Sequence, residues 1–399
     1  MRLAGIATYV NEKISSSNIT LDQYVTTDSL LQDKRGREYA QNLPPVTTNL
    51  IHYQPGDVLV ANIRPYLKKV WFADCEGGAS SDVLVLRAKN ANDTTFVYAL
   101  LMQDSFYDYA MKGAKGSKMP RGDKDQIMRY EFPIFSPEQR KDIGKFITDI
   151  ESKIAVNRHI NDNLEAMAKQ LYDYWFVQFD FPNEEGKPYK SSGGKMVWND
   201  KLKREIPDGW EVGNLSDYLQ VITERVSAST VNESTKYAPI EVLPRKKMSF
   251  NECAPIENAI SGLCAFRHKN ILLSNRRVYF HKVCIAAYDG ITRDTVIVLK
   301  PNANDLLGYS YQLVNDNVFI EYATRHSYGS EQPVLSWESA KMYKVLKPKS
   351  GLDVLYSKCA ESIIDCVIEN ELEIATLTKQ RDELLPLLMN GQVSPLNSD

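Results

Sequence analysis

Apolar residues recur at alternating steps of four and three along two long stretches of the chain, a pattern typical of helices that pack along one another. In the first stretch the pattern falls on Ile143, Ile147, Ile150, Ile154, Asn157, Asn161, Leu164, Ala168, Leu171 and Trp175. In the second it falls on Ile363, Val367, Asn370, Ile374, Leu377, Arg381, Leu384 and Leu388. We therefore expect two long coiled-coil helices, each of about 33 residues and roughly 50 Å at 1.5 Å per residue.

Each of these seams contains an asparagine at the same place in the pattern, Asn157 in the first and Asn370 in the second. A buried asparagine in such a seam lowers stability but fixes the register of the helices. The pair is therefore a candidate for setting how the two helices lie together. An asparagine at a wet end of the seam would have no such role.

Shorter apolar runs outside the helices are rich in β-branched residues, which is typical of strands. Examples are DVLVANI at 57–63 and DVLVLRA at 82–88, and later KNILLSN at 269–275 and DTVIVLK at 294–300. The stretch 94–113, TTFVYALLMQDSFYDYAMKG, predicts one helix. Strands and helix thus alternate before the first long helix, and strand runs come before the second as well.

The two halves of the chain are copies of one unit, displaced by 213 residues. At this displacement identical residues meet: Asn62 with Asn275, Arg64 with Arg277, Tyr66 with Tyr279, Lys69 with Lys282, Val70 with Val283, Ala73 with Ala286 and Gly77 with Gly290. GSKMP at 116–120 meets GSEQP at 329–333. Because Asp82 is matched to Asp294, the alignment predicts that one residue is lost and later regained between these blocks.

The repeat and the helical seams together divide the chain into unit, helix, unit and helix. We expect one domain at 1–142, a helical spacer at 143–182 and a second domain at 211–350. The second helical spacer is expected at 351–390. The polar, Gly- and Lys-containing stretch 183–210 predicts a linker, and Gly391 and Pro395 predict a frayed tail at 391–399.

Composition gives the broad class of protein. The chain has 43% hydrophobic and 25% charged residues, no apolar run long enough to span a membrane and no signal-peptide pattern at MRLAGIATYV. A cytoplasmic protein without a membrane partner is therefore expected. The net charge of −3 argues against tight DNA binding by the chain alone, because nucleic-acid binders usually have a basic excess.

Catalytic and metal-binding motifs are missing from the sequence. The six cysteines form no CxxC pair and the five histidines form no HxxxH, so no metal site is expected. A Walker loop, GxGxxG and GxSxG are also missing, and LPPV at 43–46 lacks the Asn and the aromatic residue of an adenine methyltransferase pocket. The chain is expected to be non-catalytic and to hold no cofactor.

Surface loops that differ between the copies offer the donors that read DNA bases or neutralise phosphates. The candidate DNA-binding residues in these loops are Lys34, Arg35, Arg37, Lys115, Lys118, Arg121, Arg245, Lys246, Lys247, Arg267, His268, Arg325 and Tyr328. Residues that the copies share suit a scaffold or a sequence-independent phosphate contact instead. These are Asn62, Arg64, Tyr66, Lys69, Asn275, Arg277, Tyr279 and Lys282.

With these features the sequence resembles the specificity (S) subunits of Type I restriction-modification enzymes. The resemblance rests on GDVLVANIRPYLKKVWFADCEGGASSDVLVLR, on GSKMP leading to FPIFSPEQRKDIGKFI, on the central stretch from NRHIND to IPDGWEV, and on IENELEIATLTKQRDELLPLLMNGQV. It covers nearly the whole chain. The second unit is introduced by IPDGWEVGNLSDY, which has no counterpart before the first unit, so the edge of the first domain stays open.

This resemblance implies an α+β fold with pseudo-twofold symmetry, in which two duplicated target-recognition domains are joined by two long antiparallel coiled-coil helices. Each domain of such a protein reads one half of a split, asymmetric sequence of double-stranded DNA, and the helices set the gap. The implied partners are two methylation subunits, which carry S-adenosylmethionine and methylate adenine at N6. Where present, two motor-nuclease subunits, which use ATP and Mg, join them in phage defence.

Two other functions are alternatives to DNA recognition. A coiled-coil assembly scaffold whose repeated units bind protein is compatible with the seams, although it does not need loops that differ in their basic residues. A methyltransferase in its own right does not fit the missing motifs. Binding of the chain to DNA or to an adenine methyltransferase separates these functions.

Overall fold

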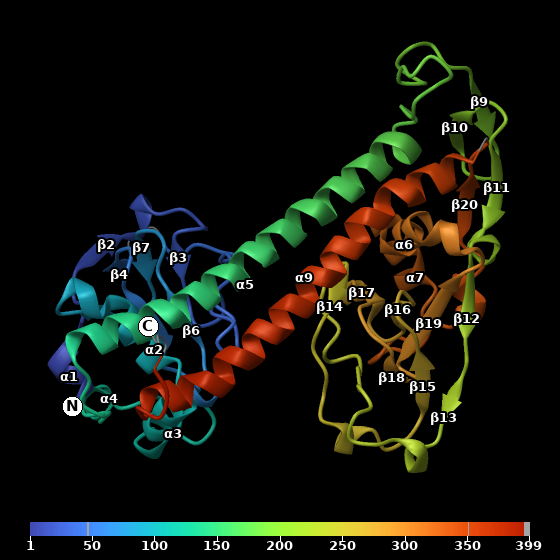
Figure 1. Cartoon of the computed structure of the whole chain (residues 1–399). Helices are drawn as coiled ribbons and strands as arrows, with labels where there is room; N and C mark the ends of the chain where they lie inside the picture. Colours follow the sequence, from blue (N-terminus) through green and yellow to red (C-terminus); the bar gives the residue numbers. More distant parts are fainter. Residues whose placement is uncertain (46–47, 350, 395–399) are drawn as a thin grey trace. The chain divides into compact units, whose positions relative to one another are not determined.

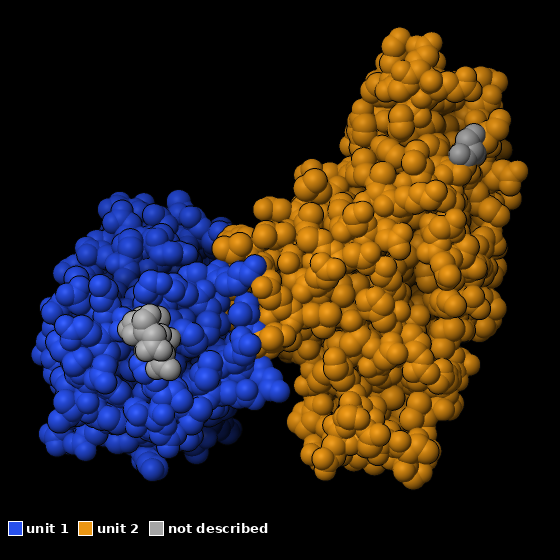
Figure 2. All heavy atoms as spheres, viewed as in Figure 1, with its two compact units in different colours: residues 1–153, 377–399 blue, residues 154–376 orange. Residues whose placement is uncertain are grey.

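The computed structural model describes residues 1–45, 48–349 and 351–394, and these form two compact units. The first unit consists of residues 1–153 and 377–399, and the second of residues 154–376 (Figure 2). Each unit therefore contains a segment of both long helices, α5 (Pro137–Tyr172) and α9 (Leu352–Met389) (Figure 1). None of the helices in the described ranges is long and apolar enough to span a membrane.

The first unit has two four-stranded sheets, with strand orders β1-β8-β5-β6 and β2-β4-β7-β3. Its strands are β1 (Ala7–Tyr9), β2 (Lys13–Ser15), β3 (Tyr24–Val25), β4 (Asn49–Tyr53), β5 (Val58–Ala61), β6 (Val70–Phe72), β7 (Gly77–Ala79) and β8 (Val83–Ala88). Its shorter helices are α1 (Leu3–Ile6), α2 (Thr94–Leu101), α3 (Asp104–Lys112) and α4 (Lys124–Met128). The pairs β1-β8, β8-β5 and β5-β6 are all antiparallel.

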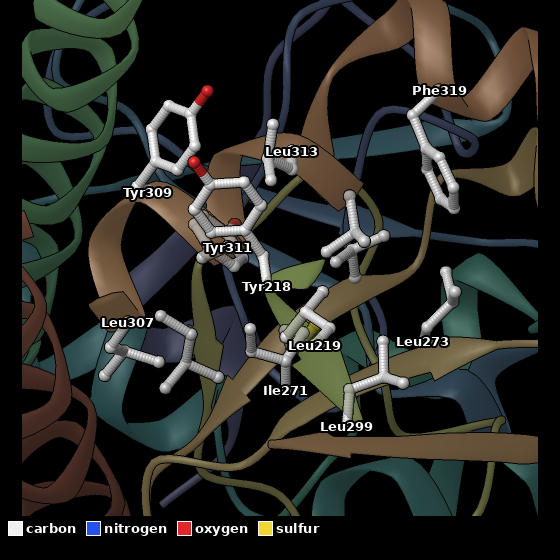
Figure 3. Packing of buried hydrophobic residues seen from close by; sticks show 14 of the residues in the cluster. Tyr218, Leu219, Ile271, Leu273, Leu299, Leu307, Tyr309, Tyr311, Leu313 and Phe319 are labelled. Carbon is white, nitrogen blue, oxygen red and sulfur yellow. The ribbon is translucent and has the colours of Figure 1, made fainter. Parts of the chain in front are cut away.

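Within the described residues, the second unit has a five-stranded sheet of order β12-β19-β16-β17-β14 and a three-stranded sheet of order β13-β15-β18. Two-stranded sheets of β9 with β10 and of β11 with β20 are added to them. Its strands are β9 (Met196–Asn199), β10 (Arg204–Pro207), β11 (Glu211–Asn214), β12 (Leu219–Ile222), β13 (Arg225–Val226), β14 (Ser249–Phe250), β15 (Leu263–Phe266), β16 (Ile271–Ser274), β17 (Val283–Ala286), β18 (Gly290–Arg293), β19 (Val296–Pro301) and β20 (Lys344–Lys347). Its shorter helices are α6 (Leu307–Asn315), α7 (Asn317–Arg325) and α8 (Trp337–Ala340). Leucine, isoleucine and aromatic side chains fill its core (Figure 3).

The repeat continues through the strands without a slip. β8 begins at Val83 and β19 at Val296, which are again 213 residues apart. The Asn62 amide donates to the Asp82 carbonyl at 2.9 Å, and the Asn275 amide donates to the Thr295 carbonyl at 3.0 Å. Thr295, and not Asp294, is therefore the counterpart of Asp82, so the predicted loss and regain of one residue is wrong.

Two other segments also differ from the sequence-based expectation. The stretch 94–113 is two helices, because Gln103 between α2 and α3 has an extended backbone. The expected linker 183–210 contains the antiparallel hairpin of β9 and β10. Its end joins the core because the Trp210 ring stacks on Phe181 with ring centroids 5.1 Å apart. Of the expected frayed tail, residues 395–399 lie outside the described residues.

The predicted seam is where α5 and α9 pack together. Every seam residue named above is buried or half-buried. Within the first unit the Arg381 guanidinium donates to Glu151 at 2.6 Å, and within the second the Tyr356 hydroxyl donates to the Ala168 carbonyl at 2.8 Å. In each unit the two helices run antiparallel, since later residues of α5 meet earlier residues of α9 (Figure 1).

The two seam asparagines, Asn157 and Asn370, contact different residues in the second unit. Asn370 Nδ2 donates to Asn161 Oδ1 at 2.8 Å, whereas Asn157 Nδ2 donates to Glu373 Oε2 at 2.6 Å. In an antiparallel pair, residues opposite each other need not be repeat counterparts, and Asn161 is the residue level with Asn370. Asn157 is 1% exposed, and its hydrogen bond to Glu373 offsets part of the cost of burying the amide in the seam. Its role in helix register stays a prediction.

A short helix of each unit packs against a long helix through a glycine, but the glycine is on opposite sides in the two copies. In the first unit Gly144 of α5 faces Thr95 and Phe96 of α2. In the second unit the counterpart of Thr95 is Gly308 of α6, which faces Ser357 and Ala360 of α9. Each contact thus has room for one side chain only, and either helix can supply the glycine.

We predict that Gly144→Ala and Gly308→Ala each lower the free energy of unfolding by about 1–3 kcal/mol, as overpacking does. A Cβ on Gly144 would lie 2.5 Å from the Phe96 amide nitrogen, and one on Gly308 would lie 2.6 Å from the Ala360 Cβ. The free-energy cost of these close contacts exceeds the gain of about 1 kcal/mol that alanine in place of glycine brings to a helix. Urea unfolding of the variants and the parent chain measures the net change.

The matched control is Gly5→Ala, because a Cβ at this position in α1 meets nothing within 4 Å. We expect Gly5→Ala to leave stability unchanged or to raise it. If Gly144→Ala and Gly308→Ala were also as stable as the parent chain, the close packing of the helices would be refuted.

Candidate nucleic-acid interface

The turn between β5 and β6 has the same backbone as the turn between β16 and β17. Each contains a short 3₁₀ turn, Pro65–Leu67 or Val278–Phe280, with a left-handed residue on either side. The residue before it is Arg64 with φ 53° or Arg277 with φ 48°. Left-handed backbone costs a residue with a side chain roughly 1–2 kcal/mol, so the strain is present in both copies.

A small hairpin is hydrogen-bonded to this turn in each unit. The Arg64 amide donates to the Pro120 carbonyl at 2.7 Å, and the Arg277 amide donates to the Pro333 carbonyl at 3.0 Å. The hairpins are closed by the bridges Lys115 to Arg121 and Tyr328 to Val334. We call residues 62–69 with 115–122, and residues 275–282 with 328–335, the turn–hairpin frames. The two frames share their main-chain hydrogen bonds although many of their side chains differ.

Four of the eight shared residues are buried or half-buried, and three of them bind main-chain carbonyls outside the frame. The Lys69 ammonium donates to the Thr27 carbonyl, and the Lys282 ammonium donates to the Ile240 carbonyl at 2.6 Å. Burial lowers the pKa of both lysines. Asn62 is buried and Asn275 is half-buried; Asn275 Nδ2 donates to the Asp294 carbonyl at 2.7 Å. These contacts favour the scaffold role for Lys69, Asn275 and Lys282, and for Asn62 the burial of the side chain favours it.

The other shared residues lie closer to solvent. The side chains of Tyr66 and Tyr279 are each 50% exposed, and Arg64 is exposed while Arg277 is half-buried. A guanidinium and a phenol hydroxyl both donate hydrogen bonds that suit phosphate oxygens. These four residues therefore stay candidates for a phosphate contact.

Several of the predicted loop residues lie on the hairpins of the frames. Lys115 and Lys118 are exposed, and Arg121 is exposed with an ion pair to Asp82 at 3.0 Å. In the second unit Tyr328 is 64% exposed. Arg325 lies close to this hairpin in sequence, at the end of α7, and is exposed. The two hairpins thus collect polar side chains of different chemistry on the same backbone.

Lys34, which the sequence analysis expects to bind DNA, is instead a structural cation of the first unit. It is 6% exposed and its ammonium lies 3.1 Å from Asp104 and 3.1 Å from Asp382 of α9. The sequence does not reveal this role because Asp382 is far away along the chain.

Two other candidates lie near Lys34 in the sequence. The Arg37 guanidinium lies 4.1 Å from the centre of the Trp71 ring, while Arg35 is exposed and donates to the Gln32 carbonyl at 3.1 Å.

The remaining candidates belong to the second unit outside its frame. Arg245 lies over the Phe280 ring at 4.0 Å and Arg267 forms an ion pair with Glu224 at 2.8 Å. Lys246 and His268 are exposed, and the His268 amide donates to Asp289 at 2.7 Å. Their contact with DNA stays a prediction.

Lys247 anchors its loop on the long helices of the second unit. Its ammonium pairs with Asp162 of α5, and the next residue, Met248, donates its amide to Glu165. From the same loop region Asn251 Nδ2 donates to Glu371 of α9 at 2.5 Å. Burial raises the pKa of Glu165 to about 7 and also raises the pKa of Glu371. This polar cluster ties a candidate DNA-binding loop to the helix pair.

The candidates chosen from the sequence do not include several exposed residues of the frames, among them Met119, Arg276, Glu331 and Gln332. Arg276 is exposed and its guanidinium donates to Gln332 Oε1 at 3.0 Å, while Met119 on the other hairpin is 53% exposed. A signal for them was present, because at the repeat displacement Arg276 meets Ile63 and Gln332 meets Met119 within otherwise matched blocks. In the described ranges, no three His, Cys, Asp or Glu side chains are grouped so as to hold a metal ion.

The fold and the frames define a class of protein in which an α+β unit is duplicated and joined by two long helices. No protein-family model matches the chain. The chain is 24% identical over 312 residues to the Type I restriction enzyme MjaIX specificity subunit of Methanocaldococcus jannaschii, which covers 75% of this chain and 68% of that protein. It is 20% identical to the HindI specificity subunit of Haemophilus influenzae over 85% of this chain and 86% of that protein.

Among solved structures, the S subunit of a Type I restriction-modification system from M. genitalium shares the fold. The TM-score is 0.56 at 13% identity, over 98% of this chain and 95% of that chain. The expected α+β fold is thereby confirmed. The resemblance of the chain to the specificity subunits of Type I restriction enzymes is confirmed as well.

The raised pKa of Glu165 predicts that the protein loses stability as the pH rises from about 4.5 to 7. Over this range the folded state holds a proton at Glu165 that the unfolded state has released, so folding becomes less favourable with rising pH. Glu165→Gln removes this dependence. We therefore expect the difference in the free energy of unfolding between variant and parent to shift by about 1–2 kcal/mol in favour of the variant from pH 5 to pH 8. Urea unfolding at the two pH values measures the difference.

Glu369→Gln, at an exposed position of α9, is the matched control and should leave the pH profile of the parent chain unchanged. A profile for Glu165→Gln that equals the parent profile would mean that Glu165 is ionised and well solvated in the folded protein.

Proposed function

We propose that the chain is the non-catalytic DNA-recognition subunit of a Type I restriction-modification complex, in which each unit reads one half of a bipartite, asymmetric target. The resemblance to specificity subunits supports the DNA-recognition role. The proposal that each unit reads its own half of the target rests on one observation: the two frames have the same main-chain hydrogen bonds but different exposed side chains. Because the two frames have the same backbone, they present equivalent positions to DNA. The different side chains at these positions then select different bases.

The chemistry of the frames suits DNA. Arginine donates two hydrogen bonds to the guanine edge, and a glutamine amide both donates to and accepts from the adenine edge. Lysine neutralises phosphate or donates to guanine. The first frame offers Lys115, Lys118 and Arg121, and the second offers Arg276 and Gln332. Because the net charge of the chain is −3, we expect weak DNA binding by the chain alone and tight binding when a partner adds phosphate contacts.

The long helices are proposed to set the gap between the half-sites and to dock the methylation subunits. With 36 and 38 residues, α5 and α9 have lengths of roughly 54 and 57 Å at 1.5 Å per residue. On α5, Val156, Ile160 and Met167 are 51%, 40% and 57% exposed. Apolar side chains that face solvent on a helix are typical of a protein interface, so they support docking of a partner.

Two methylation subunits are expected because the chain contains the unit and the helix twice. They would bring S-adenosylmethionine and the adenine N6 chemistry, and two motor-nuclease subunits would bring ATP and Mg for cleavage. This chain would contribute the choice of sequence. Half-sites about one helical turn apart are expected, as for other readers with two domains.

Exchange of one unit tests the proposal. Replacing residues 1–136, which end before α5 begins, with those of a relative of different specificity should change one half of the methylated sequence. The other half and the gap should stay the same, since the second unit and the helices are untouched. Methylome sequencing of cells that express the chain with its methylation subunit gives both halves and the gap.

A change in both halves would contradict separate reading by the two units. The assembly-scaffold alternative predicts a different outcome, in which the chain copurifies with protein partners but neither the parent nor the exchanged chain directs any sequence-specific adenine methylation.

A further inference from the structure

The duplicated frame allows exposed side chains to be sorted by whether the two copies share them. Two half-sites of different sequence have the same sugar-phosphate backbone but different base edges. A residue that contacts phosphate can therefore be the same in both units, whereas a residue that reads a base must differ. This inference rests on the proposed function, because it assumes that both units bind DNA.

The shared exposed residues lie on the turn of each frame. Tyr66 and Tyr279 have equal exposure, and Arg64 and Arg277 have the same left-handed backbone. Glycine would relieve this strain, yet an arginine occupies the position in both copies. Strained backbone that is kept by a side chain is common at functional sites. The shared residues thus fit the phosphate contact.

The unshared residues at the tips of the hairpins lie at fixed places relative to this turn. Gly116 and Gly329 have φ values of 100° and 99°, and the carbonyls of Pro120 and Pro333 accept from the turn at 2.7 and 3.0 Å. Between these anchors the first unit has Lys118 and Met119 and the second has Glu331 and Gln332. All four residues are exposed.

These tips differ in the base edges that they can recognise. A Gln332 amide suits adenine, and a Glu331 carboxylate accepts from the amino group of cytosine. Lys118 donates to guanine, and Met119 offers an apolar contact that suits the methyl group of thymine. In the second unit Arg276 holds the Gln332 amide at 3.0 Å, whereas Ile63 at the same place in the first unit cannot do so.

We propose that the hairpin tips, Lys118 and Met119 in the first unit and Glu331 and Gln332 in the second, determine specificity by reading bases at corresponding positions of the two half-sites. The shared turn fixes each tip against the DNA backbone. Arg276 is a positioning residue that orients the Gln332 amide. Other loops of each unit read the remaining bases.

The test exchanges the tips within the full chain, coexpressed with its methylation subunit in cells without other adenine methylation. The first variant is Glu331→Lys with Gln332→Met, and the second is Lys118→Glu with Met119→Gln. Each should change the methylated sequence at one or two positions of one half-site only, with preference for the original base reduced roughly tenfold or more. Methylome sequencing gives these preferences.

Glu233→Lys is the matched control for the first variant, because Glu233 is exposed and lies outside the frame, and the charge change is the same at each glutamate. It should leave the methylated sequence unchanged. Binding of the purified complex to a library of half-site sequences gives a second readout that does not depend on methylation in cells.

Two results would overturn the inference. One is an unchanged methylated sequence in both tip variants. The other is an affinity that falls equally for all half-site sequences, since a phosphate contact would give this result. If the parent chain directs no bipartite methylation at all, the proposed function fails, which is a different outcome from failure of the tips.

Discussion

Each unit of this protein is completed by a long-helix segment from the other repeat, and the rest of the structure depends on this packing. In the first unit Leu385, Leu388 and Met389 of α9 join a core whose other buried residues lie between Leu3 and Ile147. In the second unit Tyr172, Trp175 and the following Phe176, at the end of the first repeat's helix, pack against Tyr309 and Tyr356. Neither unit would have a full core if the other repeat's helix were removed.

This sharing explains where the buried charges are found. Arg381 is 3% exposed, and its ion pair with Glu151 joins α9 to α5 within the first unit. The buried Lys34 ammonium likewise pairs with Asp382 of α9, whereas the Lys247 and Asp162 side chains, which pair in the second unit, are 47% and 50% exposed. A buried pair contributes little net stability, but removing one partner is costly, so such pairs favour a single register. The first unit is therefore held in one alignment with its segments of the two helices.

Much of the architecture could be predicted from the sequence because repetition and helical periodicity are strong signals. The displacement of 213 residues places β5, β6, β8, α2 and α3 on β16, β17, β19, α6 and α7 with matching starts. The errors arose where tertiary contacts override local pattern. Gln103 breaks a helical pattern, and Trp210 draws a polar stretch into the core.

The candidate site could be predicted only in part. Composition identified the loops, but whether a lysine faces solvent depends on residues distant in sequence, as Lys34 shows. Likewise, Asn157 and Asn370 are equivalent positions of the repeat, but the residue that Asn370 contacts across the antiparallel helices is Asn161. Arg276 and Gln332 were missed because their significance lies in their contact with each other. Comparison of the two copies on one backbone is what separates shared from variable positions.

If the two units read DNA as proposed, both turn–hairpin frames face the duplex. A structure of the complete complex with its methylation subunits on a target duplex would show this. We expect Arg64 and Arg277 to lie against phosphates, and residues 118–119 and 331–332 to lie in the major grooves of the two half-sites. A complex in which either frame faces away from the DNA would contradict this expectation.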